Sequence, residues 1–169
     1  MSITIRKLTP DDCEAYRACR LDALRDSPHS FASSYEEEVR MTNEAIHERF
    51  AAHPPESAFF GAFDGERIVG LTGIFREERL KRRHKMNIVS VFVQPEYRGQ
   101  GIATRLVETA IAHARKIDGV ERIDLAVESA NVPAKSLYAS FGFQSWGTEP
   151  SFAKVDGVEY DEEHMSLKL

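Results

Sequence analysis

The sequence predicts a mixed α/β domain built on one central sheet. Strand-like and helix-like segments alternate in the middle of the chain, and antiparallel hairpins flank this region. The 169 residues fit a single domain, which we expect to span residues 1–169, because no internal repeat, low-complexity tract or linker divides the chain. The expected architecture is therefore one sheet covered by helices.

The chain is expected to begin with a strand and a helix. Apolar and polar residues alternate around Ile5, as in a strand with one buried face. Thr9 and Pro10 then supply the N-cap and the first-turn proline of a helix that ends near Asp26. Residues 27–39 lack periodicity, so we expect a loop or short helical turns there.

A second helix and a hairpin follow. Residues 42–52 have helical character, and a Pro-Pro pair shortly afterwards ends this helix. Residues 58–63 and 67–75 are expected to pair with each other, because Asp64 and Gly65 between them are typical of a tight hairpin turn.

The middle of the sheet is expected at residues 86–93. This segment has almost no polar interruption, as expected for a strand that is covered on both faces. Apolar residues then repeat at helical spacing over residues 102–114, which form the strongest predicted helix. A strand at 122–127, a short helix at 131–140 and a hairpin that turns at residues 156–157 complete the chain.

The charge of the chain argues against nucleic-acid binding. The net charge is −5, whereas phosphate backbones are bound by concentrated Lys and Arg. One basic segment, residues 79–85, lacks the interleaved aromatic residues of a nucleic-acid site. We interpret it as a solvated hairpin turn, with contact to an acidic substrate or to a neighbouring subunit as the alternative.

Hydropathy and cysteine usage predict a cytoplasmic protein. No apolar run approaches the roughly 20 residues of a membrane span, so we expect no membrane partner, and residues 1–8 lack the apolar stretch of a secretory signal. Cys13 and Cys19 lie six positions apart on one predicted helix, on well-separated faces, so they cannot pair. Neither has the neighbours of a metal site, and we expect no metal.

Residues 94–104 join the central strand to the strongest predicted helix. A helix N-terminus presents unpaired backbone N–H groups and the positive end of the helix dipole, and Gly99 and Gly101 let an anion approach this backbone closely. A P-loop would need lysine after its second glycine, and none is present. A dinucleotide-binding turn would need a small residue at Thr104, so it fits poorly. The other alternative is a glycine turn that only starts a helix.

Two short motifs then occur in order along the chain. Arg98, Gly101 and Ala103 match an Arg/Gln-x-x-Gly-x-Gly/Ala signature. Residues 131–138, with their Asn, Ala and Leu-Tyr, precede the Gly-Phe pair within residues 141–143. The two motifs together resemble those of the GNAT superfamily of acetyl-coenzyme A-dependent N-acetyltransferases, most specifically from Met86 to Phe143.

The resemblance implies a particular sheet and coenzyme site. The sheet would have about six to seven strands, mostly antiparallel, with helices on both faces. Two parallel central strands, here 86–93 and 122–127, would splay apart around the pantetheine arm, which would bind the backbone of Phe92 and Val93 because splaying leaves amides unpaired. The diphosphate would bind the amides that open the long helix. These residues are Arg98, Gly99, Gln100, Gly101, Ile102, Ala103 and Thr104.

The second motif implies further contacts to the coenzyme. Asn131 would hydrogen-bond the pantetheine arm, although its residue type equally suits a helix N-cap. Lys135 would reach a phosphate, with an exposed helix lysine as the alternative. Tyr138 would donate to the departing sulfur, and its alternative role is packing of a helix on the sheet.

A general base is less evident. Residues 86–93 contain no Asp, Glu or His, so any base must come from elsewhere or act through water. Glu128, just past the next strand, is the first candidate, and an exposed strand-end carboxylate is its alternative role. His84 and residues 36–38 are weaker candidates.

The resemblance implies an enzyme that transfers an acetyl group from acetyl-CoA to a primary amine by direct attack in a ternary complex. The acceptor would be a small amine or a peptide amine, and a homodimer stays open. Three alternatives remain at this point: another acyl donor or acceptor, a non-catalytic coenzyme A sensor, and an adaptor that uses the basic hairpin.

Overall fold

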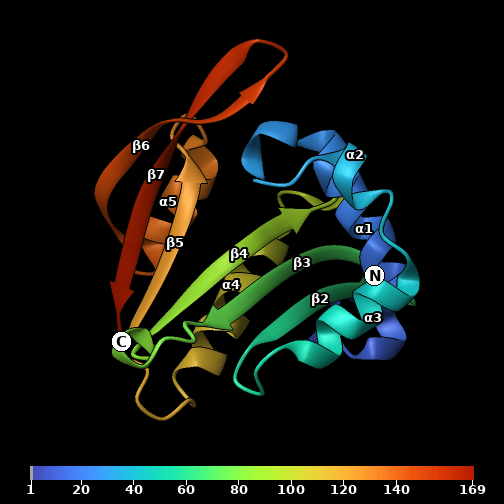
Figure 1. Ribbon diagram of the computed structural model, residues 1–169, viewed down its shortest axis with the longest axis horizontal. Coiled ribbons are helices and arrows are strands. Elements are labelled where there is room, and N and C mark those ends of the chain that lie inside the picture. Colours follow the sequence, from blue (N-terminus) through green and yellow to red (C-terminus); the bar gives the residue numbers. More distant parts are fainter. Residues whose placement is uncertain (1) are drawn as a thin grey trace.

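The computed structural model describes residues 2–169 and shows a seven-stranded sheet with helices on both faces (Figure 1). The strands are β1 (Thr4–Lys7), β2 (Ala58–Asp64), β3 (Arg67–Arg76), β4 (Lys85–Val93), β5 (Arg122–Glu128), β6 (Gln144–Val155) and β7 (Val158–Lys168). Their order is β1-β2-β3-β4-β5-β7-β6, and all neighbours are antiparallel except β4 and β5. The predicted fold class is confirmed, with β4 at the centre.

The helices are α1 (Cys13–Asp26), α2 (Tyr35–Glu38), α3 (Asn43–Ala52), α4 (Ile102–Ala114) and α5 (Val132–Ser140). Short 3₁₀ turns are η1 (Pro10–Asp12), η2 (Pro28–Ser30), η3 (Leu80–Arg82) and η4 (Pro95–Tyr97). Helices α1 and α3 cover one face of the sheet, and α4 covers the other (Figure 1). Residues 27–39, expected as a loop or short turns, contain η2 and α2.

Local side-chain contacts explain where several helices begin. The Thr9 amide donates to the Asp12 carboxylate over 2.8 Å at the start of η1. The Thr42 hydroxyl accepts from the Ala45 amide at the start of α3. Such N-caps satisfy amides that have no partner within the helix. Thr9 was expected to cap the first helix, but its hydroxyl donates to Asp12, and the 3₁₀ turn η1 precedes α1.

Helix α4 is held tightly against the sheet. Its inward side chains Leu106, Val107, Ala110 and Ala114 are fully buried, together with Ile123 of β5. Burial of a side chain of this kind contributes about 1.5–3 kcal/mol for the larger residues. The N-terminus of α4 therefore has a fixed position beside the end of β4.

A bulge interrupts β4. Gly73 pairs with Val89 and Leu71 pairs with Phe92, so β4 uses one residue more than β3 between these pairs. Ser90 has a φ of 57°, a left-handed conformation that costs a non-glycine residue about 1 kcal/mol. The extra residue reverses which side chains face α4 beyond this point.

The parallel pair β4 and β5 separates after three residues. Pairing runs from Lys85↔Arg122 to Asn87↔Asp124 and then stops. Figure 1 shows the two strands diverging beyond this point. The facing edges at residues 88–93 and 125–128 therefore have no ladder bonds to each other, as the splayed pair was expected to show.

The basic segment lies in the connection between β3 and β4. Arg82 pairs with Glu77 over 2.8 Å, and Arg83 pairs with Glu56 over 2.9 Å. The segment 79–85 is exposed or partly exposed throughout, in agreement with a solvated turn. Among the residues from Ser2 onward, no helix combines the length and apolar character of a membrane span.

Both cysteines are free and buried in the layer between α1 and the sheet. Burial raises the pKa of Cys19 to about 12. The thiol therefore stays protonated at neutral pH and packs as an apolar group.

Candidate active site

A cavity of about 410 Å³ lies where β4 and β5 separate. Strand backbone of β4 and β5 forms its walls, with the start of α4, helix α5 and the η2 region around it. Seven of the residues selected from the sequence line this cavity: Phe92, Val93, Arg98, Ala103, Glu128, Asn131 and Tyr138. The fold thus brings residues from four separate segments to one place.

The turn before α4 has the properties of an anion site. Gly99 and Gly101 have φ values of 75° and 74°, and a Cβ at either position would meet no atom within 4 Å. Glycine is therefore favoured by conformation, and the space in front of the turn is open. Within residues 2–169, the amides of 101–104 donate to no acceptor. These amides and the helix dipole favour a bound anion.

Arg98 ties this turn to its surroundings. Its Nε donates to the carbonyl oxygen of Val93 over 2.9 Å, and its Nη2 is paired with Asp26 of α1. The guanidinium is therefore already engaged at the end of β4, and the backbone amides are the groups that remain available to a phosphate.

Besides Gly99 and Gly101, four residues predicted for the coenzyme site do not line the cavity. Ile102 is a core residue, 2% exposed, and Thr104 is exposed on α4. The Gln100 side chain donates to the Glu96 carbonyl. Lys135 is paired with Glu163 over 2.7 Å. The backbone of the first three can contribute to an anion site, whereas Lys135 would have to leave its partner to reach a phosphate.

Tyr138 lies buried at the cavity, 6% exposed, in edge contact with Phe143. Burial raises the pKa of its hydroxyl well above the ordinary value. The phenol therefore stays protonated over the physiological range. It suits hydrogen-bond donation to a developing negative charge rather than full proton transfer.

Asn131 caps α5, because its side-chain oxygen accepts from the Ala134 amide over 3.1 Å. It also lines the cavity. Since the oxygen is used by the cap, the NH₂ group is the part of this side chain that can bind a carbonyl of a ligand. The two roles expected from the sequence can therefore coexist.

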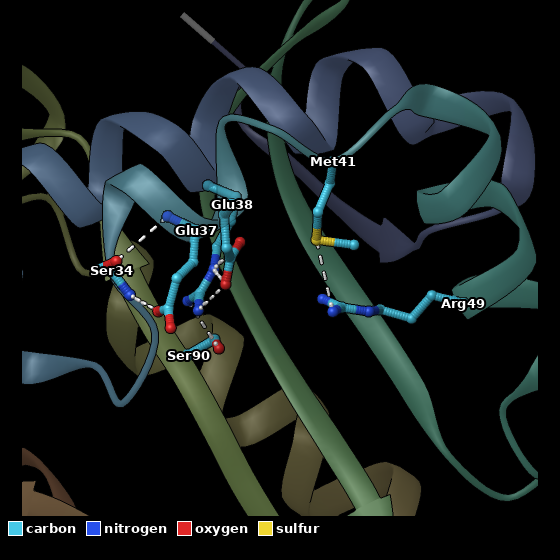
Figure 2. Close-up of polar contacts among 7 residues, drawn as sticks. Ser34, Glu37, Glu38, Met41, Arg49 and Ser90 are labelled. Carbon is cyan, nitrogen blue, oxygen red and sulfur yellow. Dashed lines mark hydrogen bonds and ion pairs between the residues drawn. The ribbon is translucent and has the colours of Figure 1, made fainter.

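A buried ion pair behind the β4 bulge was not foreseen from the sequence. Arg20, 8% exposed, pairs with Glu38 over 2.8 Å and donates to the Ser90 hydroxyl over 3.1 Å. Figure 2 shows Glu38 of α2 lying close to Ser90 of β4. Burial opposes ionisation of Glu38, but the hydrogen bonds and charge of Arg20 prevail and lower the pKa of this carboxyl. The one feature of the sequence that could have indicated a polar contact here is Ser90, a serine inside an otherwise apolar strand.

Of the base candidates, Glu128 alone lines the cavity. It pairs with His29 of η2, with 3.0 Å between Nε2 and the carboxylate oxygen, a partner that the sequence did not indicate. His84 precedes β4, at the end of the strand away from the cavity. Glu37 is used to cap α2 through Ser34, as Figure 2 shows.

Comparison with known proteins identifies the family to which the chain belongs. Residues 18–143 match the model of the acetyltransferase (GNAT) family. Mycothiol acetyltransferase of Propionibacterium freudenreichii is 27% identical over 96% of this chain and 54% of its own length. N-alpha-acetyltransferase RimI of Mycobacterium tuberculosis is 33% identical over 62% of this chain and 63% of its own. The chain thus spans about half to two thirds of the length of these curated relatives.

Among solved structures, yncA of Salmonella typhimurium, determined with its cofactor acetyl-CoA, has a TM-score of 0.84. It is 19% identical, and the alignment covers 100% of this chain and 95% of that one. At this identity the likeness extends to the fold alone.

Proposed function

The chain belongs to the GNAT family of acetyltransferases, and from this we propose that it transfers an acetyl group from acetyl-CoA to a primary amine. One observation carries the proposal: a cavity between separated strands lies beside unpaired amides at a helix N-terminus. The acceptor class is a small amine or a peptide amine.

The residues present fit acetyl-CoA, which accompanies yncA in its solved structure. The amides of 101–104 suit the diphosphate, because they are unpaired and lie at the positive end of α4. The unpaired backbone edge of residues 88–93 suits the amides of a pantetheine arm. The NH₂ group of Asn131 supplies a further donor along this path.

Chemistry in this site would rest mainly on proximity and on hydrogen-bond donors that are already in place. A backbone N–H near Val93 would polarise the thioester carbonyl, and the Tyr138 hydroxyl would donate to the sulfur as it gains negative charge. The nitrogen–carbon bond forms while the carbon–sulfur bond breaks. The amine proton must leave in the same process.

The free energy needed to remove that proton depends on the pKa of the acceptor amine. A lysine-like amine, with a pKa near 10.4, costs about 4–5 kcal/mol to deprotonate at pH 7, whereas an α-amine near 8 costs about 1–2 kcal/mol. Glu128 is the carboxylate that lines the cavity, so we propose it as the base.

A panel of amines tests the function. The purified protein is incubated with acetyl-CoA and, in turn, amino acids, polyamines, aminoglycosides and short peptides, and release of free coenzyme A is measured. Turnover with at least one amine class supports the proposal. Tight coenzyme binding without turnover on any amine would contradict it and would favour a sensor. Parallel reactions with longer acyl-CoA donors show whether acetyl is the preferred group.

A further inference from the structure

A histidine and a glutamate from distant segments meet at the end of β5. The Nε2 atom of His29 lies 3.0 Å from a carboxylate oxygen of Glu128. The imidazole also stacks on the ring of Tyr160 in β7, with centroids 4.6 Å apart and planes 15° apart. The imidazole is therefore held at its edge by the carboxylate and at its face by the tyrosine.

This pair connects the cavity with solvent. Glu128 lines the cavity, and its side chain is only 11% exposed. The His29 side chain is 31% exposed. A proton accepted at Glu128 therefore has a second titratable group within hydrogen-bond distance that water can reach.

Strand geometry places Glu128 on the face opposite α4. Ile123, Leu125 and Val127 belong to the core cluster that packs on α4. Because successive side chains of a strand alternate, Glu128 points to the other face, where η2 lies. The carboxylate thus lines the η2 side of the cavity, where a protonated amine would meet a group of opposite charge.

We propose that Glu128 and His29 form a proton relay for the acetyl transfer, an inference that rests on the proposed function. In the Nδ1–H tautomer of His29, Glu128 accepts the proton that leaves the amine nitrogen and then gives it to Nε2, and the imidazole releases its Nδ1 proton to water. Proton exchange with water then returns the imidazole to the Nδ1–H tautomer for the next turnover. The electron pair of the broken carbon–sulfur bond leaves with the sulfur. Because an imidazole is a stronger base than a carboxylate, the second transfer is downhill.

Few other charged groups face the imidazole. Within residues 2–169, Glu128 is the one carboxylate whose oxygens come within 4.0 Å of the ring nitrogens. Asp26 of α1 interacts with His29 electrostatically but forms its ion pair with Arg98. Tyr160 contributes a neutral ring. Glu128 is therefore the charged group in direct contact with the imidazole.

The relay differs in its pH dependence from a pair that only holds η2 against β5. The test measures kcat and KM across pH for the wild type, His29→Gln and Glu128→Gln, on the best amine from the panel. His47→Gln is the matched control, because His47 is an exposed histidine on α3. Thermal unfolding and coenzyme A affinity are recorded for every variant, to separate misfolding from loss of chemistry.

We expect wild-type kcat to fall at acid pH as a histidine is protonated. In His29→Gln, kcat should drop about tenfold at neutral pH, its acid limb should move to lower pH, and coenzyme affinity should stay within twofold. Glu128→Gln should lose about 100-fold in kcat or more, the usual contribution of a general base. A further variant, His29→Ala, is assayed with and without added imidazole, and we expect imidazole to restore part of its activity.

A His29→Gln enzyme with the wild-type pH profile, or with a changed KM alone, would overturn the relay and leave the acetyltransferase assignment intact. Absence of wild-type turnover with every amine would instead overturn the proposed function, and the relay with it. The two failures are therefore distinguishable.

Discussion

Gly101 lies in the turn that we propose binds the coenzyme diphosphate. Its φ of 74° disfavours any side chain, and open space lies before it. Glu at this position would strain the turn and place a negative charge beside the proposed diphosphate site. We expect Gly101→Glu to weaken coenzyme A binding by at least 100-fold, measured by isothermal titration calorimetry.

The matched control is Gly157→Glu in the β6–β7 turn. Gly157 also has a positive φ of 81° and an open Cβ direction, and it lies at the tip of the β6–β7 hairpin, away from α4 (Figure 1). This variant should carry similar backbone strain and bind coenzyme A normally. Equal affinity losses in both variants would mean that strain, and not an anion site, explains the effect.

Tyr138 should affect turnover more than binding. Tyr138→Phe keeps the buried ring and removes only the hydroxyl, so we expect kcat to fall about 10- to 100-fold and coenzyme affinity to change less than twofold. Since burial raises the pKa of this hydroxyl, it stays protonated up to high pH, and it should not produce an alkaline limb in the pH profile. Steady-state kinetics from pH 6 to 10 check both points.

At the level of single residues, the sequence motifs predicted some of the residues that line the cavity and missed others. Arg98, Asn131 and Tyr138 line the cavity as expected, because they belong to short motifs with fixed local geometry. Lys135 was expected near a phosphate and is paired with Glu163 instead. That partner lies on β7, and no local pattern around Lys135 could indicate it.

At the scale of elements, the buried Arg20–Glu38 pair contacts the β4 bulge, because Arg20 donates to the Ser90 hydroxyl. Removing one partner of a buried ion pair usually costs about 3–5 kcal/mol, whereas replacing both with apolar residues is far milder. We therefore expect Glu38→Leu to lower the free energy of unfolding more than the double variant Arg20→Met/Glu38→Leu. Urea unfolding of the three proteins measures this, and equal stability of the two variants would contradict it.

The same pair should respond to pH. The pKa of Glu38 is lowered in the folded state, so its contribution is present above the unfolded value, near 4.3, and is lost as pH falls through the folded value. The wild type should therefore lose more stability than the double variant below about pH 4. The double variant should also have lower kcat, because Ser90 loses its donor. An unchanged kcat in the double variant would mean that the hydrogen bond from Arg20 to Ser90 does not affect catalysis.

Sequence periodicity predicted helices and strands well and the bulge not at all. The buried face of α4 repeats at helical spacing, and hairpin turns carry Asp-Gly pairs, so these elements follow from local patterns. The extra residue in β4 is visible only once its register against β3 is known. A run of apolar residues is compatible with either register.

For the whole molecule, the separation of β4 and β5 creates the site. The cavity collects residues from β4, β5, α4, α5 and the η2 region. The motifs predicted residues that line this cavity, because each motif lies at a strand–helix junction. The His29–Glu128 contact joins segments about a hundred residues apart, so it required the folded chain.

The most direct test of the account is a crystal structure of the protein soaked with coenzyme A. We expect the diphosphate to accept hydrogen bonds from the amides of 101–104 and the pantetheine arm to run between β4 and β5. Coenzyme A bound elsewhere, or amides of α4 without a phosphate contact, would contradict it.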